Sequence, residues 1–349
     1  ASPGSAILGG DLPDWMKSLF CGSAASSSAS SAAAESSVVA AGEAAAGEAA
    51  ASSAASSEAA SSAFSLLPTY DADPLTGEAR KSTGRMVGVM VNNIANSERQ
   101  NARPQRGIGS ADLLIESKVE GGITRLCAVF RDADTIPEVG PLRSGRDQFL
   151  QLLMPYQALY YHDGESIFCT QFINVYDYSG LNIGGKSYFN TPVHPHVAHR
   201  DNRGRNVAYE HTEFTSGKEI KQAAGNAGIG LIYANETPFF HFADYRTAAS
   251  NDLPGAPAAK TISITHSESY RTRLTYYAGD SHDVQSVNYV AGGQAYLFTR
   301  GGVQVGRWEK PHPTHPLKLY TETGEEMTLN RGKTYLALVD NDEWSNFSY

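Results

Sequence analysis

Alternating side chains on both sides of a double glycine are the feature that most constrains the fold. Within residues 111–119, Leu113, Ile115 and Val119 alternate with polar or charged neighbours, as in a strand with one buried face. Gly121-Gly122 then supplies the positive φ angles that a tight turn needs, and residues 124–131 return as a second apolar strand. The pattern predicts an antiparallel β-hairpin with one face for the core and a charged opposite face.

The segments around this hairpin predict a layered arrangement. Residues 86–91 form an apolar run typical of a buried strand, and residues 158–162 read as another strand. Apolar residues at helical spacing predict helices in 145–156 and 218–227. We therefore expect an α+β or α/β N-terminal domain over residues 80–245, in which helices cover a mixed sheet.

A second domain is expected after a change in composition. Residues 246–259 are polar and rich in Pro and Gly, as in a linker between domains. Residues 260–342 then contain short β-rich runs separated by glycine-containing turns. This texture predicts a smaller, antiparallel, β-rich C-terminal domain.

The N-terminal part cannot build a core of its own. Residues 23–66 are a low-complexity Ser/Ala tract, which we expect to be a disordered linker. In front of it, Cys21 has the position of a lipidated cysteine that starts a tether, so residues 1–22 are a possible remnant of a lipoprotein signal. Residues 1–18 nevertheless lack the apolar run of a secretory signal, and an ordinary thiol at Cys21 is the alternative.

Composition excludes several functional classes. A formal net charge of −9 argues against a nucleic-acid binder, which needs Lys and Arg to neutralise phosphates. Three scattered cysteines do not make a disulfide framework. Phosphate-binding glycine loops and a Gly-x-Ser-x-Gly elbow are absent from the sequence, so we expect no cofactor. No apolar stretch is long enough to span a membrane.

Charged residues around the hairpin are the candidate ligand-binding site. They come from Arg103-Pro104-Gln105, from Glu120 to Arg125 and from Gly140 to Arg146. If the guanidinium groups gather over the polar face of the hairpin, they can bind a phosphate or carboxylate in bidentate fashion. The alternative is structural, with the glutamates pairing with the arginines to fix the 132–146 loop. The candidate residues are Arg103, Glu116, Glu120, Arg125, Arg143, Arg146, His162 and Asp163.

Histidines cluster at His194-Pro195-His196 and His199, with His211 nearby. Imidazole is a common ligand of zinc and copper. Pro195 disfavours a regular helix and no His-Glu-x-x-His spacing occurs, so the pattern favours a His-rich loop over a metal site. We therefore assign no metal ligand from the sequence.

The charged run from residue 101 to 146 resembles the YerB-like family of bacterial envelope lipoproteins. The resemblance extends more loosely over residues 85–340 and includes segments 306–310 and 329–334. It implies an N-terminal and a C-terminal domain, a lipid anchor at Cys21 and an extracytoplasmic location at the cell membrane, and the family has no established activity. This chain departs from the family's pattern in the loop 162–165, which carries two added carboxylates, and in 209–212.

These features predict a tethered envelope protein. We expect it to bind an anionic wall polymer, a peptidoglycan fragment or a partner protein through an Arg/Glu-lined cleft. The alternative is a hydrolase or transferase acting on cell-envelope glycans or phosphate-linked polymers, with a carboxyl or imidazole group of the candidate set as acid or base. A metal-dependent hydrolase is a third reading. A carboxyl group with a raised pKa facing two arginines would indicate an enzyme, and closed salt bridges would indicate a scaffold.

Overall fold

The structure is a computed structural model. It describes residues 72–186, 192–232, 237–243, 260–265, 268–277, 280–299, 301–341 and 343–348, without the side chains of 260–261 and 263–284. The predicted signal remnant 1–22 with Cys21, the Ser/Ala linker 23–66 and the linker 246–259 lie outside the described residues. Within the described part of the chain, no helix has the length and apolar character needed to span a membrane.

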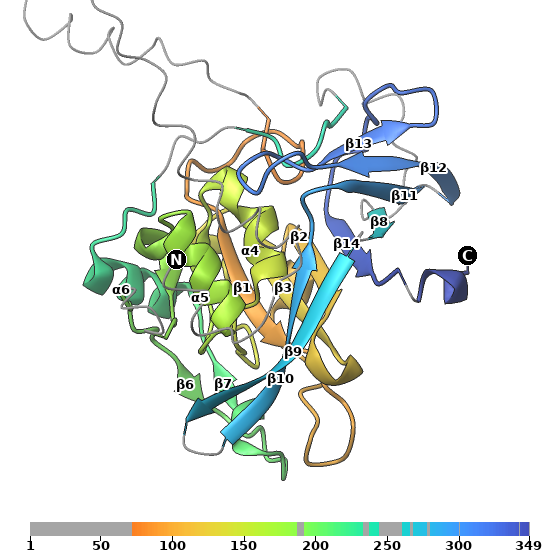
Figure 1. Cartoon of the computed structure of the whole chain (residues 1–349). Helices are drawn as coiled ribbons and strands as arrows, with labels where there is room; N and C mark the ends of the chain where they lie inside the picture. Colours follow the sequence, from red (N-terminus) through yellow and green to blue (C-terminus); the bar gives the residue numbers. More distant parts are fainter. Residues whose placement is uncertain are drawn as a thin grey trace, which may run out of the picture. The chain divides into compact units, whose positions relative to one another are not determined.

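A mixed sheet of ten strands organises the molecule (Figure 1). Strands β1 and β4 pair in parallel, as do β4 and β5, and β14 is parallel to both β2 and β8; the other neighbours are antiparallel. In spatial order the strands are β13 (Lys318–Thr321), β12 (Gly302–Glu309), β11 (Gly292–Thr299), β8 (Lys260–Thr265), β14 (Thr334–Val339), β2 (Leu113–Lys118), β3 (Thr124–Phe130), β1 (Val87–Asn92), β4 (Leu159–Tyr161) and β5 (Asn182–Ile183).

Helices and two small ribbons complete the described part of the fold. The α-helices are α4 (Asp147–Leu153), α5 (Ile167–Val175) and α6 (Gly217–Ala227). The ribbons pair β6 (His199–Arg200) with β7 (Glu213–Phe214), and β9 (Glu268–Tyr277) with β10 (Asp280–Asn288). Short 3-10 turns occur at Ile108–Ser110, Glu120–Gly122, Ala133–Thr135, Met154–Tyr156, Ser179–Leu181, Tyr209–His211 and Trp344–Asn346.

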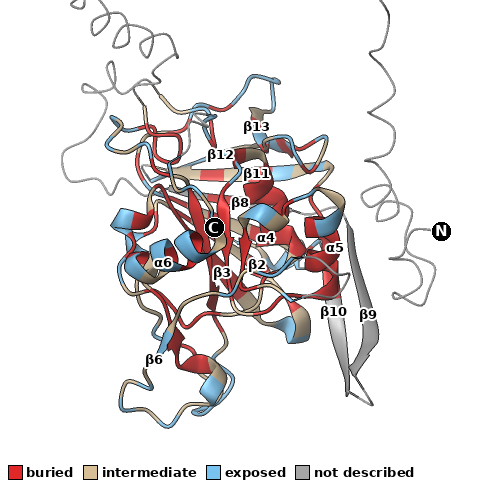
Figure 2. Ribbon diagram, turned by 90° about the vertical axis from the view of Figure 1, so that its left-hand side faces the viewer, coloured by how far each residue is buried: buried red, intermediate tan, exposed pale blue. Residues whose placement is uncertain are grey.

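Each face of the sheet has its own core. Leu113 and Ile115 of β2 pack with the buried side chains of α4 and α5, whereas Val87 and Val89 of β1 pack with Ile220 of α6 on the opposite face. Figure 2 shows the buried strands β2 and β3 between α6 and α4. The period-two alternation of strand side chains produces this division, because successive residues point to opposite faces.

The predicted hairpin and fold class are confirmed. Strands β2 and β3 pair antiparallel with Ile115 opposite Cys127, and Gly121 and Gly122 adopt φ angles of 73° and 72° in the turn. The β-rich C-terminal region is antiparallel through β8, β11, β12 and β13. Strand β14 instead inserts between β8 and β2 in parallel, so the sheet of the first region continues into the second. Sequence order alone does not reveal this insertion.

Asp147 joins α4 to β10 in the interior. Its Oδ2 accepts a hydrogen bond of 2.6 Å from the Ser286 hydroxyl, and Gln151, one turn later, donates to the carbonyl of Val287 at 2.9 Å. The Asp147 side chain is wholly buried, and this burial raises its pKa to about 7. A carboxyl group held protonated up to that pH contributes stability that is lost as the pH rises.

The substitution Asp147→Asn tests this account. The folded-state pKa lies above that of the unfolded chain, near 3.8, so the free energy of unfolding of the wild type should fall between about pH 4 and pH 7 and then level off. Asn keeps the acceptor for Ser286 without an ionisable proton. Urea denaturation should therefore show the variant gaining stability relative to the wild type from pH 5 to pH 8, by about 3 kcal/mol, because the wild type loses about 1.4 kcal/mol per pH unit between pH 5 and its folded-state pKa of about 7. A constant difference between the two proteins across this range would contradict the assignment, and Asp134→Asn, at an exposed position, is the control.

Candidate functional site

The carboxyl ends of the parallel strands β1, β4 and β5 meet at one edge of the sheet, where open α/β sheets bind their ligands. His162 and Asp163 follow β4 directly, and Gly184 follows β5. Gly184 has a φ of 96°, and a Cβ atom there would lie 1.6 Å from the carbonyl oxygen of His162. Only glycine allows these two strand ends to approach so closely.

Three side chains from separate segments meet beyond these strand ends, and we call them the strand-end cluster: Asp163, His196 and Glu213. One oxygen or nitrogen atom of each lies within 4.8 Å of those of the other two. His196 Nε2 is 3.1 Å from Glu213 Oε1, and the Arg200 guanidinium is 3.3 Å from Glu213 Oε2. The cluster therefore brings two carboxyl groups together with one imidazole.

Backbone contacts hold the cluster in place. The 194–198 loop is fixed because the Val197 N–H donates to the Tyr161 hydroxyl at 2.7 Å, and this hydroxyl donates to the Val197 carbonyl at 2.7 Å. Glu213 lies in β7 opposite Arg200, and its carbonyl accepts from the Leu142 N–H at 2.7 Å. The cluster is therefore attached to the sheet through β4 and through the segment that precedes α4.

The members of the cluster shift one another's pKa values. Burial and the hydrogen bond with Glu213 raise the pKa of Asp163. Burial would raise the pKa of Glu213 too, but contacts with His196, Asp163 and Arg200 outweigh it and lower the pKa. The hydrogen bond to Glu213 raises the pKa of His196. Asp163 thus retains its proton more readily than an exposed aspartate, and His196 more readily carries positive charge.

Arg143 projects next to this cluster from the segment before α4. Its N–H donates to the Met90 carbonyl at 3.1 Å, and its carbonyl accepts from the Asp163 N–H at 3.3 Å. Burial lowers the pKa of its guanidinium, which also interacts electrostatically with Glu210, Asp163 and Glu213. Among the residues that the structure describes, none forms a hydrogen bond or close ion pair with this guanidinium. Arg143 is therefore available to an anion from outside.

Glu120, Arg125 and Arg146 form a closed group under the hairpin turn. Arg146 donates to both carboxylate oxygens of Glu120 at 2.9 to 3.0 Å, and Arg125, only 4% exposed, donates to the Ser144 carbonyl at 2.7 Å. Burial would raise the pKa of Glu120, but Arg146 and Arg125 together hold it below its usual value. These residues fit the structural alternative of the sequence analysis, in which glutamates pair with arginines to fix the 132–146 loop.

Glu116 and Arg103 lie apart from that group. Glu116 has the strand parity of Leu114, which packs on the α6 face, and accepts hydrogen bonds from Asn93 at 3.0 Å and from the Tyr335 hydroxyl. Arg103 is exposed and donates to the Asn93 carbonyl at 3.1 Å. The structure thus divides the predicted set, because Glu116 faces one side of the sheet while Glu120 sits in the turn and pairs toward α4.

His162 and Asp163 point in different directions. His162 is wholly buried, with Nε2 2.7 Å from Asn182 Oδ1 and 3.5 Å from Glu165 Oε2. Asp163 is partly exposed and faces the strand-end cluster. A ligand that reaches Asp163 would not touch His162, whose place in the fold is structural.

The other clustered histidines do not converge on one point. His199 contacts Glu219 through Nδ1 at 2.9 Å and Glu138 through Nε2 at 3.1 Å. His211 lies between Asn92 and Gln100, at 3.0 and 2.9 Å. The sequence analysis did not single out Arg200 or Glu213 and treated His196 only as part of a His-rich loop. The pairing of β6 with β7 brings these residues together, and two-residue strands leave no periodic signal.

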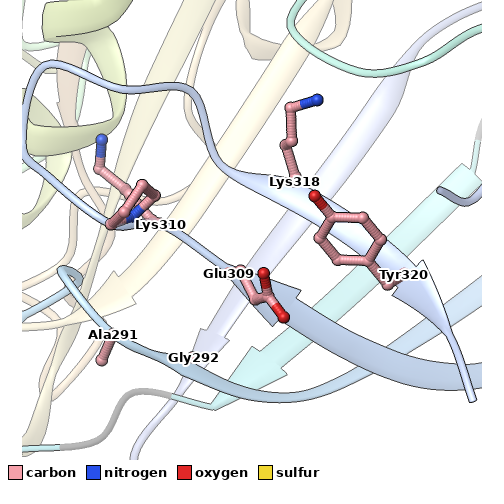
Figure 3. A pocket seen from close by; sticks show the side chains of 7 residues that line it. Ala291, Gly292, Glu309, Lys310, Lys318 and Tyr320 are labelled. Carbon is pink, nitrogen blue, oxygen red and sulfur yellow. The ribbon is translucent and has the colours of Figure 1, made fainter. Parts of the chain in front are cut away.

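A cavity of about 410 Å³ lies in the C-terminal region, away from the strand-end cluster (Figure 3). Its charged lining residues are Glu309, Lys310 and Lys318, and Arg307 pairs with Glu309 at 2.9 Å while Lys318 pairs with Glu326 at 3.3 Å. The Lys310 ammonium is buried and donates to backbone carbonyls, including that of Pro313 at 2.8 Å, and burial lowers its pKa to about 7. This cavity does not offer an unpaired positive charge comparable to Arg143.

Comparisons with known proteins agree with this architecture. Residues 75–230 match the N-terminal domain of a family described as "Protein of unknown function (DUF3048)", and residues 223–336 match its C-terminal domain. The protein named "Putative lipoprotein YerB" of Bacillus subtilis is 29% identical over 237 residues, which is 66% of this chain and 60% of the relative. The chain thus spans less than two thirds of the length of that relative.

A solved structure shares the fold. The crystal structure of the YerB protein from Bacillus subtilis matches 77% of this chain and 96% of its own, with a TM-score of 0.55 and 21% sequence identity. At this level of identity the match supports the mixed α/β architecture and its β-rich C-terminal region, and it carries no activity across.

Glu120→Gln tests the structural role of the closed group. Removing the negative charge leaves Arg146 and Arg125 buried without compensation, which should lower the free energy of unfolding by about 3 kcal/mol in urea denaturation. Glu309→Gln is the matched control, because it breaks an Arg–Glu pair whose side chains are both nearly half exposed. That change should cost less than about 1 kcal/mol. Equal effects of the two substitutions would show that Glu120 has no special structural role.

Proposed function

The chain belongs to the DUF3048 family, a family without an assigned activity, and from this premise we propose that it is a membrane-tethered envelope protein that binds an anionic polymer through Arg143 and the strand-end cluster. The observation that carries the proposal is the state of Arg143. Its guanidinium is partly buried at the carboxyl ends of the parallel strands and, within the described part of the chain, is not engaged by a close carboxylate. The guanidinium nitrogens are not among the enclosed atoms of the described residues, so a phosphate or carboxylate group can take the place of solvent and form charge-assisted hydrogen bonds with them.

The charge balance around Arg143 favours an anion. Arg200 and His196 already compensate Glu213, and the raised pKa of Asp163 reduces the negative charge of the cluster. Arg143 and Arg205 both affect His211. Burial and the positive charges of these two arginines together lower the pKa of His211. Glu210 balances part of the charge of Arg143, and the positive charge of both guanidinium groups still acts on the surroundings of His211.

Two further arginines, Arg203 and Arg205, lie on the β6–β7 loop. Nε and Nη2 of Arg203 and Nη1 of Arg205 are buried and have no hydrogen-bond partner among the described residues. These nitrogens are enclosed, so the two side chains add positive charge to the loop and are not counted as contacts of the polymer.

The envelope location is supported by the relative and by the N-terminal sequence. The Bacillus subtilis relative carries the name of a lipoprotein, and Cys21 precedes a Ser/Ala tract in this chain. A lipid-anchored domain of this kind would meet wall polymers, which in many bacteria are linked by phosphate. We therefore favour an anionic wall polymer over a peptidoglycan fragment or a partner protein.

One observation favours an enzyme as the second candidate. The pKa of Asp163 is raised by burial and by its contact with Glu213, and both Arg143 and Arg200 act on this carboxyl. A carboxylic acid with a raised pKa beside two guanidinium groups has the properties of a general acid in the cleavage of a phosphate-linked or glycosidic bond. Release of monomers from the polymer by the wild type, lost in Asp163→Asn, would establish this second function.

Arg143→Ala tests the binding proposal. Losing a charge-assisted hydrogen bond costs about 1.5 to 3 kcal/mol, so the affinity for a phosphate-linked wall polymer should fall roughly 10- to 100-fold. The measurement is retention of the purified chain on an immobilised poly(glycerol phosphate) polymer, over a series of salt concentrations. Wall material stripped of phosphate-linked polymer should retain the wild type and the variant equally.

Arg307→Ala is the control for charge. It removes the same charge from β12, which lies close to the sheet edge opposite β4 and β5, and from an exposed side chain. Its retention should match that of the wild type. If Arg143→Ala and wild type are retained equally, or if both alanine variants lose the same affinity, Arg143 does not form the binding site.

A further inference from the structure

We propose that Asp163, His196 and Glu213 bind one divalent transition-series cation, with Zn²⁺ or Mn²⁺ as the fitting ions. This site goes beyond the proposed polymer binding and does not depend on it. It rests on the meeting of one imidazole and two carboxylates from three separate segments. Such a mixed nitrogen and oxygen set suits zinc and its transition-metal neighbours, whereas Ca²⁺ prefers six to eight oxygen ligands.

The spacing of the ligand atoms fits an ion between them. Nitrogen and oxygen ligands lie about 2.1 Å from zinc, so two ligands of a tetrahedral zinc ion are about 3.4 Å apart. His196 Nε2 and Glu213 Oε1 are 3.1 Å apart, and all three ligand atoms lie within 4.8 Å of one another. A contraction well under 1 Å per atom would bring the set into coordination distance.

The surroundings orient two of the ligands. Arg200 approaches the second oxygen of Glu213, Oε2, at 3.3 Å and leaves Oε1 turned toward His196. The ring of Tyr161 meets the His196 ring edge-on at a centroid distance of 6.4 Å, and the Tyr161 hydroxyl fixes the backbone of the next residue, Val197. Carboxylates and imidazoles that bind metals have such outer partners, which fix their orientation before the ion arrives.

Exposure leaves a path to the ion. Asp163 and His196 are only partly buried, while Glu213 is buried at the base of the cluster. Three protein ligands leave at least one coordination position open for water or for an oxygen of a ligand. A cation held in the cluster would also add positive charge beside Arg143, so an anionic group could contact both.

The experiment is a direct titration of the metal. The full chain is stripped with a chelator, dialysed and titrated with Zn²⁺ by calorimetry and with Mn²⁺ by electron paramagnetic resonance of the free ion. We expect one ion per chain for each metal and no saturable binding of Ca²⁺. The ion should also raise the thermal unfolding temperature, since it binds the folded state.

His196→Gln and Asp163→Asn are the test variants. Each removes one ligand at a partly exposed position, and the affinity for the ion should fall at least about 100-fold, because even changes to outer partners cost about 10- to 100-fold. Circular dichroism and the unfolding temperature without metal report whether each variant remains folded. Using two variants keeps the test valid if one of them fails to fold.

His199→Gln is the matched control. His199 also contacts two carboxylates, Glu138 and Glu219, but through its two different ring nitrogens, so these groups cannot close on one ion. Its substitution should leave the affinity unchanged. The proposal is overturned if the wild type binds no ion, if a folded His196 or Asp163 variant binds as tightly as the wild type, or if His199→Gln loses the same affinity.

These outcomes are separate from those of polymer binding. The titration uses the metal alone, so failure to bind an ion leaves the Arg143 experiment unaffected. Arg143→Ala should in turn retain the ion within about threefold, because Arg143 is not a ligand. Loss of the ion in that variant would place Arg143 among the groups that build the metal site and would overturn the assignment of Asp163, His196 and Glu213 as its three ligands.

Discussion

The largely buried ion pair between Glu120 and Arg146 is the interaction on which the rest of the site depends. It joins the hairpin turn to the start of α4, and Arg125 beside it holds the carbonyl of Ser144. The segment between these contacts therefore has a fixed path across the ends of the strands. Arg143 lies at the beginning of that segment, and its backbone is bonded to β1 and to Asp163. The ion pair between Glu120 and Arg146 thus fixes the position from which the guanidinium of Arg143 projects.

Two arginines three residues apart consequently have different roles. Arg146 and Arg143 belong to the same charged signature and have the same side chain, but Arg146 pairs with the carboxylate of the turn, whereas Arg143 faces a cluster in which Glu213 is already paired with Arg200 and His196. The difference comes from the partners and not from the arginines. A run of charged residues in a sequence therefore indicates where interactions concentrate, and only the geometry distinguishes those that close within the fold from those that remain open.

Local patterns in the sequence were sufficient for much of the fold. The alternation around Gly121-Gly122 predicted the hairpin, and helical spacing over 145–156 and 218–227 predicted α4 and most of α6. Both depend on interactions between near neighbours in the chain, which leave a periodic signal. The insertion of β14 between β8 and β2 depends on partners that are distant in the sequence. Strand β2 lies more than a hundred residues before β14, and β8 is separated from β14 by a region without a local pattern. No residue spacing therefore predicts the insertion.

The site was predictable only in part for the same physical reason. Arg143 and Asp163 were candidates because they stand in charged segments after or between recognisable strands. Glu213 was not, since it lies in a two-residue strand and reaches His196 only through the pairing of β6 with β7 and the bond of its carbonyl to Leu142. Strand parity alone predicts that Glu116 and Glu120, four residues apart, share one face of the sheet, but β2 ends at Lys118 and Glu120 lies in the glycine turn, where the alternation no longer applies.

The two proposals share one feature of the architecture. Parallel strands β1 and β4 end at the same edge of the sheet, where Tyr161 at the end of β4 pairs with Val89 and β1 continues to Asn92, and the chain leaving each strand carries polar groups. Gly184 lets a third strand end approach, which narrows the space into which these groups project. Because Asp163 and Glu213 lie close together there, their mutual repulsion has to be relieved by a proton, by neighbouring cations or by a metal ion. The fold therefore places two carboxyl groups that repel each other at this edge of the sheet. The cation that reduces this repulsion also determines how strongly Arg143 attracts an anion.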